Sequence, residues 1–127
     1  MPHAIATGSF PAYRPRRMRI NPVLRSFMRE TSLSAHDLIY PLFVVPGKNV
    51  KEPVSRMPGV FHHSVDMLPQ ELDELTACGV RAVILFGIPA DKDACGSEAY
   101  DEHGIVQQAV RAIREHAPEM LVITDVC

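Results

Sequence analysis

Several features that would narrow the function are scarce or missing in this sequence of 127 residues. Tryptophan is absent, and the three cysteines contain no Cys-x-x-Cys pair. An odd cysteine count without paired spacing argues against a disulfide framework and favours a reducing, cytoplasmic location. No apolar run approaches the roughly 20 residues of a membrane span, and the N-terminus lacks the apolar core of a secretory signal, so we expect no membrane partner.

Phosphate-binding motifs are missing too. Neither G-x-G-x-x-G nor G-K-[ST] occurs, so the sequence gives no support for nucleotide binding. The charge is uneven, because residues 1–36 carry six arginines against one acid, Glu30, whereas the remainder carries seven bases and fourteen acids. Nucleic acid, an anionic membrane or an acidic protein surface could each bind such a basic arm. Because its arginines alternate with apolar residues and no aromatic-rich basic motif follows, we expect it to dock on protein and not on nucleic acid.

Helical and strand patterns alternate along the chain. Asn21 and Pro22 form an N-cap and N1 pair for a short amphipathic helix. A second helix is predicted from a cap at Asp66 to Gly79, with Pro69 in its first turn. A third follows the loop 88–104, with an apolar stripe at Val106, Ala109, Val110, Ile113 and Ala117. Buried strands are predicted over residues 38–45, 80–87 and 121–126, and an irregular loop or small hairpin over 48–61.

This alternation predicts an α/β fold whose sheet is parallel and has right-handed crossovers. An open doubly wound sheet and a (β/α)8 barrel both satisfy the pattern, and both place functional groups at the carboxyl ends of strands. A barrel needs about 250 residues and eight strands. If the fold is a barrel, the chain therefore supplies its N-terminal part, three βα units, after an extended and helical arm.

The last residues, "LVITDVC", place an acid and a thiol at a strand end. Asp125 and Cys127 are two residues apart, so on a strand both side chains point to the same face, which in a barrel is the lumen at its upper rim. The alternative is that Cys127 is a small buried residue and that Asp125 caps whatever follows. One thiol alone is not a zinc site, because zinc takes three or four protein ligands.

The other reactive residue types give weaker signals. His62 and His63 are adjacent, so on an extended segment they point apart, and we expect both to lie on the surface. The three lysines, Lys48, Lys51 and Lys92, are predicted to lie in polar loops. Such loops lack the apolar surroundings that lower the pKa of a Schiff-base lysine.

Six segments, taken in order and spacing, resemble the N-terminal part of porphobilinogen synthase, the family also called 5-aminolevulinate dehydratase. They are "RPRRMR", "DLIYPLFVVPG", "MPGVFHHSVDML", "VILFGIP", "GSEAYDEHGIVQQAVRAIR" and "LVITDVC". The resemblance implies a TIM barrel, with residues 1–36 as an arm that joins subunits, usually into a homo-octamer, and residues 37–127 as the first part of the catalytic domain.

The resemblance also implies a function. The family is a hydro-lyase of haem biosynthesis that condenses two molecules of 5-aminolevulinate into porphobilinogen and releases two waters. Its two substrate-holding lysines lie on later barrel strands, and none of the three lysines here matches them, so the chain alone is expected to be inactive. Two alternatives remain: a self-contained open α/β module that binds a small molecule, and a fragment that acts only through its arm.

Site residues follow from the same resemblance. Cys127 matches the first of three zinc thiolates in the zinc-dependent branch of the family, and Asp125 matches an active-site aspartate beside them. Other branches replace these cysteines and dispense with the zinc. A magnesium ion at subunit contacts, present in some members, would be held mainly by residues outside this sequence.

Overall fold

The computed structural model describes residues 8, 11, 13–14 and 16–126. The chain divides into two compact units, residues 1–33 and 34–127, three residues before the predicted boundary. In the first unit, α1 (Pro22–Phe27) follows a single 3₁₀ turn, Arg17–Arg19. The side chain of Asn21 accepts a hydrogen bond from the Leu24 amide at 2.8 Å, which confirms the predicted cap. Most of the described apolar side chains of this unit are exposed, including Ile20 at 73% and Phe27 at 80%.

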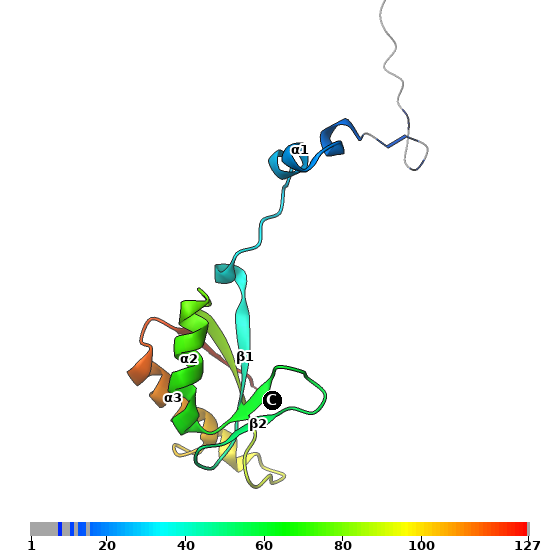
Figure 1. The fold of residues 1–127 in the computed structure, drawn as a ribbon. Coiled ribbons are helices and arrows are strands. Elements are labelled where there is room, and N and C mark those ends of the chain that lie inside the picture. The colour runs from blue at the N-terminus through cyan, green and yellow to red at the C-terminus, as the bar shows by residue number, and fades with distance from the viewer. Residues whose placement is uncertain (1–7, 9–10, 12, 15, 127) are drawn as a thin grey trace, which may run out of the picture. The chain divides into compact units, whose positions relative to one another are not determined.

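The second unit is a five-stranded sheet with two helices (Figure 1). Its strands are β1 (Ile39–Val44), β2 (Lys51–Pro53), β3 (Phe61–His63), β4 (Ala82–Gly87) and β5 (Leu121–Thr124). Its helices are α2 (Leu68–Ala77) and α3 (Ile105–His116), and 3₁₀ turns occur at Ala35–Asp37, Val65–Met67 and Ser97–Ala99. The sheet order is β2-β3-β1-β4-β5, and only the β2–β3 hairpin is antiparallel.

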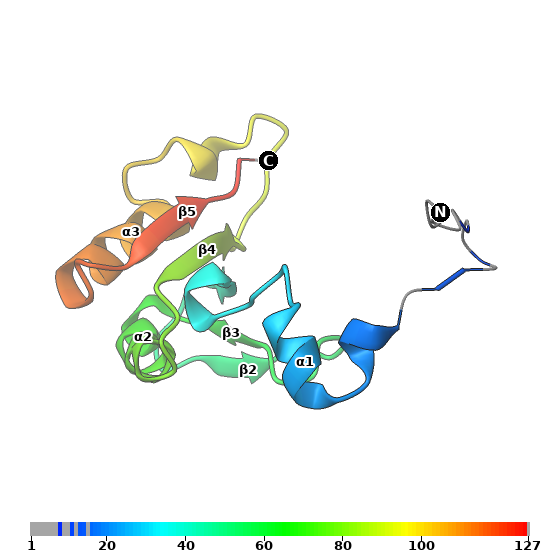
Figure 2. The same ribbon diagram turned by 90° about the horizontal axis from the view of Figure 1, so that it is seen from above.

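The main strands β1, β4 and β5 follow one another across the sheet in chain order, and both helices pack on the same face (Figures 1 and 2). An open doubly wound sheet instead reverses its strand order and carries helices on both faces. A barrel adds each strand on the same side and keeps every helix outside. The arrangement is therefore that of the first βα units of a barrel, as predicted.

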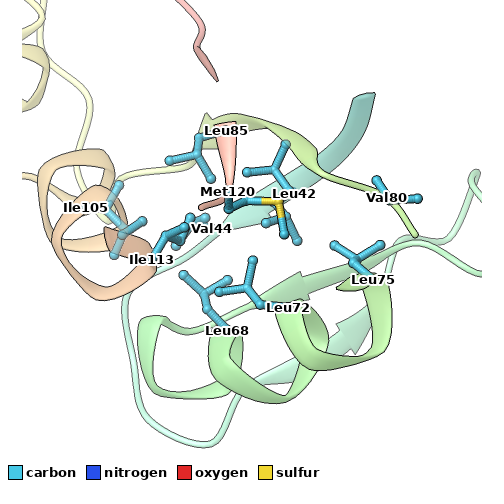
Figure 3. Close-up of a cluster of buried hydrophobic side chains, with 12 residues drawn as sticks. Leu42, Val44, Leu68, Leu72, Leu75, Val80, Leu85, Ile105, Ile113 and Met120 are labelled. Atoms are coloured by element: carbon cyan, nitrogen blue, oxygen red, sulfur yellow. The ribbon is translucent and has the colours of Figure 1, made fainter. Parts of the chain in front are cut away.

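The core lies between the sheet and the two helices (Figure 3). Leu42 and Val44 of β1 alternate with residues of the other face, as do Val83 and Leu85 of β4, and all four are fully buried. They meet Leu68, Leu72 and Leu75 of α2 and Ile105, Ala109 and Ile113 of α3. The apolar stripes of the two helices and every second side chain of the strands thus pack into a single core.

Pro41 is tolerated inside β1 because of the direction in which its backbone points. The Val44 carbonyl accepts from Ile88 at the end of β4, whereas the Val45 amide donates to His63 of β3. Backbone groups alternate along a strand, so Pro41, like Val45, points toward the β3 side. There β3 pairs only with Phe43 and Val44, so no ladder bond is lost at Pro41.

One predicted cap is wrong. Met67, and not Asp66, is the N-cap of α2, because a 3₁₀ turn occupies Val65–Met67. The Asp66 carboxylate instead accepts from the Asn49 amide at 2.8 Å and ties down the loop before β2. Pro69 lies in the first turn of α2, as predicted.

Gly79 ends α2 in the left-handed region, with φ of +83°. Gly79→Ala is expected to destabilise the fold by about 1 to 2 kcal/mol, because a Cβ is disfavoured at positive φ. The added Cβ would also lie 3.3 Å from Ala35 Cβ. Gly59 has the same φ, but nothing lies within 4 Å of where its Cβ would be, so Gly59→Ala is the matched control. Urea unfolding of both variants separates the backbone cost from the contact; equal losses would show that the contact costs nothing.

Candidate functional site

Asp125 directly follows β5 at the carboxyl end of the parallel sheet. Its amide donates to the Leu85 carbonyl at 3.3 Å, so the β4–β5 ladder continues one residue past the last pair, Leu85 with Thr124. This register puts Asp125 level with Phe86 on the face without helices. The side chain is exposed, as a group that meets a substrate must be.

The face around Asp125 is aromatic at the same level. Phe43 of β1 stacks on Phe86 of β4, with ring centroids 5.3 Å apart, and His62 of β3 meets Phe43 edge-on at 6.1 Å. The three rings lie on β1, β3 and β4 and Asp125 directly follows β5, so all four groups stand where the strands end at one edge. Such convergence at carboxyl ends is where α/β barrels place their active sites.

A pocket of about 700 Å³ opens beside Asp125. Its walls come from the end of β4, the loop between β4 and α3, the first turns of α3 and the end of β5. The charged side chains that line it are Asp91, Lys92, Asp93, Glu98, Arg111 and Asp125. A cavity with apolar walls and a few convergent charged groups suits a small polar molecule.

Asp93 organises the loop that forms one wall of this pocket. Its carboxylate accepts from the amides of Ser97 at 2.9 Å and Cys95 at 3.1 Å, and it also bonds the Ser97 hydroxyl. These bonds, first of all that of the Ser97 side chain, lower the pKa of the Asp93 carboxyl. The loop is therefore held by an ionised aspartate at neutral pH.

Asp93→Asn is expected to increase amide hydrogen exchange across residues 93–99, because an amide accepts hydrogen bonds less strongly than a carboxylate. In the parent protein the same loosening is expected on acidification: the folded-state pKa is lowered, so the stabilisation present above the ordinary value of 3.8 is lost as the pH falls through the folded pKa. Asp91→Asn is the control, because no hydrogen bond of Asp91 is found among the described residues. Equal exchange in both variants would contradict this role.

Of the two predicted site residues, the structure describes one. Asp125 lies at the predicted strand end, whereas Cys127 lies outside the described residues. The expectation that His62 and His63 are both surface residues is wrong, because His63 is only 1% exposed. The hairpin turns His63 toward α2, a tertiary contact that adjacent histidines in a sequence do not reveal.

The lysines also differ from the sequence expectation. Lys51 belongs to β2 and not to a loop, and its ammonium pairs with Glu71 of α2 at 3.1 Å. Lys92 does lie in a loop, but that loop lines the pocket beside Asp125. The loop lies beside Asp125 because β5 pairs with β4 in the sheet. No local pattern in the sequence reveals this contact.

Metal binding depends on the donor groups present. Across the described part of the chain, no three side chains of histidine, cysteine, aspartate or glutamate come together as a metal site would require. Of the described cysteines, Cys78 and Cys95 are exposed and unpaired with each other. These residues do not by themselves form a zinc site. Within the same residues, no helix has the length and apolar character needed to cross a bilayer.

The sequence is similar to a known protein family and to individual proteins. The family model described as delta-aminolevulinic acid dehydratase matches residues 12–127. Proteins of that name from Ruminiclostridium josui and Halalkalibacterium halodurans are 50% and 51% identical over 114 residues, 90% of this chain. These 114 residues are 56% and 35% of the two relatives, respectively, so the chain spans about half and about a third of their lengths.

A solved structure gives the same result for the fold. The delta-aminolevulinic acid dehydratase (porphobilinogen synthase) of Toxoplasma gondii, crystallised with its reaction product porphobilinogen, superposes with a TM-score of 0.83. The two sequences are 34% identical, and the match covers 90% of this chain and 33% of the other. The match therefore extends over both the sheet and the helices of this chain.

Proposed function

Because the chain belongs to the delta-aminolevulinic acid dehydratase family, we propose that β1, β4 and β5 are the first strands of a lyase that makes porphobilinogen. The reaction joins two molecules of 5-aminolevulinate and releases two waters. The observation that carries this proposal is the position of Asp125. It stands at the carboxyl edge of the sheet and lines the 700 Å³ pocket, in a chain similar to a protein crystallised with porphobilinogen.

Asp125 supplies an acceptor for the amino group of the substrate. 5-Aminolevulinate carries an ammonium, a ketone and a carboxylate, and an exposed carboxylate pairs with the first of these. In this role Asp125 orients the amine or takes its proton, since general base catalysis needs a carboxylate within hydrogen-bond reach of the proton. The stacked rings of Phe43 and Phe86 give the neighbouring face an apolar surface against which the carbon chain of the substrate can pack.

The substrate-holding lysines of the family are assigned outside residues 1–127. Lys51 is engaged by Glu71 behind the sheet, and Lys48 and Lys92 are exposed. Neither lies in the desolvated, apolar surroundings that activate a Schiff-base lysine as a nucleophile. Residues 1–127 by themselves are therefore expected to be inactive.

Zinc is proposed as the cofactor on the chemistry of Cys127, whose thiolate is a preferred zinc donor. Among the described residues no three potential ligands come together, so the remaining thiolates are also assigned outside residues 1–127. A bound zinc ion with an open position supplies Lewis-acid chemistry. We further propose a magnesium ion at subunit contacts and a cytoplasmic location for the protein.

The first unit is proposed to join subunits into a homo-oligomer, an octamer in the family. Ile20, Val23 and Phe27 are 63% to 80% exposed on α1 and beside it. Grouped apolar side chains of this kind indicate a surface that another protein covers. Sedimentation of the intact protein and of a form without residues 1–33 tests this role; the same oligomer in both would overturn it.

The proposed activity is tested by incubating the protein with 5-aminolevulinate and identifying the product by mass spectrometry. Porphobilinogen is expected from protein that carries the later barrel strands, and none from residues 1–127 alone. Product from neither sample contradicts the synthase function, and product from both contradicts the assignment of the lysines. Reading the coding sequence beyond Cys127 tests the zinc ligands separately, since a second cysteine two residues later is expected.

A further inference from the structure

A cluster of titratable side chains is buried behind the sheet, away from Asp125. Glu71 of α2 is 7% exposed and His63 of β3 is 1% exposed. The Glu71 carboxylate accepts from the Tyr40 hydroxyl at 3.0 Å through Oε1 and from the Lys51 ammonium at 3.1 Å through Oε2. His63 Nε2 lies 3.3 Å from the same Oε2. Four elements, β1, β2, β3 and α2, thus meet at one carboxylate.

His63 is close to Glu71 without being well bonded to it. Despite the 3.3 Å separation, neither ring nitrogen of His63 makes a hydrogen bond of acceptable geometry among the described residues. Buried polar atoms are nearly always well paired, so a ring whose contacts to the Glu71 carboxylate and the Phe61 backbone are only weak requires an explanation. The Glu71 oxygen nearest to His63 is already taken by Lys51, whose ammonium also lies 5.3 Å from the centre of the Phe61 ring.

The charges are balanced only while His63 is neutral. Burial is the largest influence on its imidazole and lowers the pKa, and the nearby Lys51 charge acts in the same direction, against the Glu71 charge. Burial alone would raise the pKa of Glu71, but hydrogen bonds from Lys51 and Tyr40 outweigh it and lower that pKa. Burial and the Glu71 carboxylate raise the pKa of Tyr40 to about 12, with a smaller contribution from Glu74. Lys51 and Glu71 thus form a neutral pair beside a neutral imidazole.

The hairpin that carries His63 and Lys51 has few other attachments. Strand β3 pairs with β1 at only two positions, Phe43 with His62 and Val44 with His63. The Val45 amide adds a bond to the His63 carbonyl at 2.9 Å. Within the hairpin, Ser64 bonds Val50 through both its amide and its hydroxyl. A segment held by so few bonds at a sheet edge belongs to the low-stability end of a fold.

We propose that His63, Glu71 and Lys51 form a pH-sensitive latch that fastens the β2–β3 hairpin to β1 and α2 at neutral pH and releases it on acidification. A protonated His63 would put a buried cation against the one Glu71 oxygen that the partly exposed Lys51 ammonium already uses. The site would then carry an uncompensated charge, which water solvates better than the protein interior does. Opening the hairpin exposes the imidazolium and removes this cost.

The direction of the pH effect follows from the proton balance. The closed state binds a proton on His63 less readily than the open state, whose histidine titrates near 6.5. The closed state is therefore favoured above this pH and loses stability as the pH falls below it. Glu71 acts in the same direction but only below its ordinary value of 4.5. Between pH 6.5 and 5 the response belongs to His63.

Release of the hairpin would also change the candidate site around Asp125. His62, the residue before His63, points to the opposite face of the sheet and contacts Phe43, which stacks on Phe86. Moving β3 away from β1 removes this ring from the aromatic row at the level of Asp125. The latch is a property of the fold, so it stands or falls independently of the proposed synthase activity.

The test is amide hydrogen exchange on the full chain in its native assembly, measured at pH 7.5, 6.5 and 5.5 and corrected for intrinsic rates. We expect protection across residues 51–64, relative to α3, to fall by up to about tenfold per pH unit below 6.5, the limit for one proton taken up on opening. His63→Phe and His63→Gln remove the titrating group, so their hairpins are expected to show no such slope. His62→Gln is the matched control and is expected to behave as the parent.

An unchanged slope in both His63 variants would overturn the proposal, as would constant protection of the parent hairpin over this range. Titration of the two imidazoles by NMR is a second test that needs no folded variant. His63 is expected to become charged only as the hairpin amides lose protection. An imidazolium at His63 while those amides remain protected would contradict the latch.

Discussion

Replacing Asp125 with asparagine is expected to lower kcat/KM for porphobilinogen formation by about 10²- to 10⁴-fold, the usual contribution of a positioned general acid or base. The change keeps the shape of the side chain and removes its charge. The backbone position is set by the amide bond to Leu85, which the substitution leaves in place. Folding and assembly should therefore be preserved while the proposed acceptor for the substrate amine is lost.

The measurement is steady-state product formation by the intact protein over a range of pH. Glu119→Gln is the matched control, because it removes the same charge from an exposed residue at the amino end of β5. The control is expected to retain the parent rate. If Asp125→Asn also retains it, with an unchanged pH profile, Asp125 has no part in the reaction.

The second large effect concerns the core. Leu72→Ala is expected to reduce the free energy of unfolding by about 3 kcal/mol, within the range of about 2 to 5 kcal/mol for truncation of a buried leucine. Leu72 is fully buried between α2 and the sheet, and β1, β4 and α3 all contribute to the same cluster (Figure 3). A cavity there cannot collapse without moving one of these elements.

Urea unfolding followed by circular dichroism measures the loss. Gln70→Ala is the control on the same helix, since Gln70 is exposed and its side chain bonds Glu74 one turn along that helix at 3.3 Å. That control is expected to change the stability by no more than about 0.5 kcal/mol. A loss as small for Leu72→Ala would mean that the cluster does not carry the stability of this unit.

Periodicity in the sequence was enough for the elements of the second unit. The apolar stripe of α3 and the continuous apolar runs of β1, β4 and β5 give period and length together, and these elements and α2 lie within a few residues of their predicted places. The short strands β2 and β3 have no such pattern, and only a loop or small hairpin is predicted there. Local chemistry also fixed the N-cap at Asn21 and the helix stop at Gly79, because both depend on neighbouring residues alone. Asp66 was misassigned because its carboxylate bonds Asn49, 17 residues away.

The sequence by itself determined the alternation of strands and helices, the family, and the location of Asp125 at a strand end. These follow from local periodicity and from an ordered set of motifs. Only the tertiary structure decided that the β4–α3 loop forms a pocket beside Asp125 and that His63 is buried against Glu71. Each of these joins segments far apart in the chain, and their meeting is set by packing around a shared core, which no local pattern encodes.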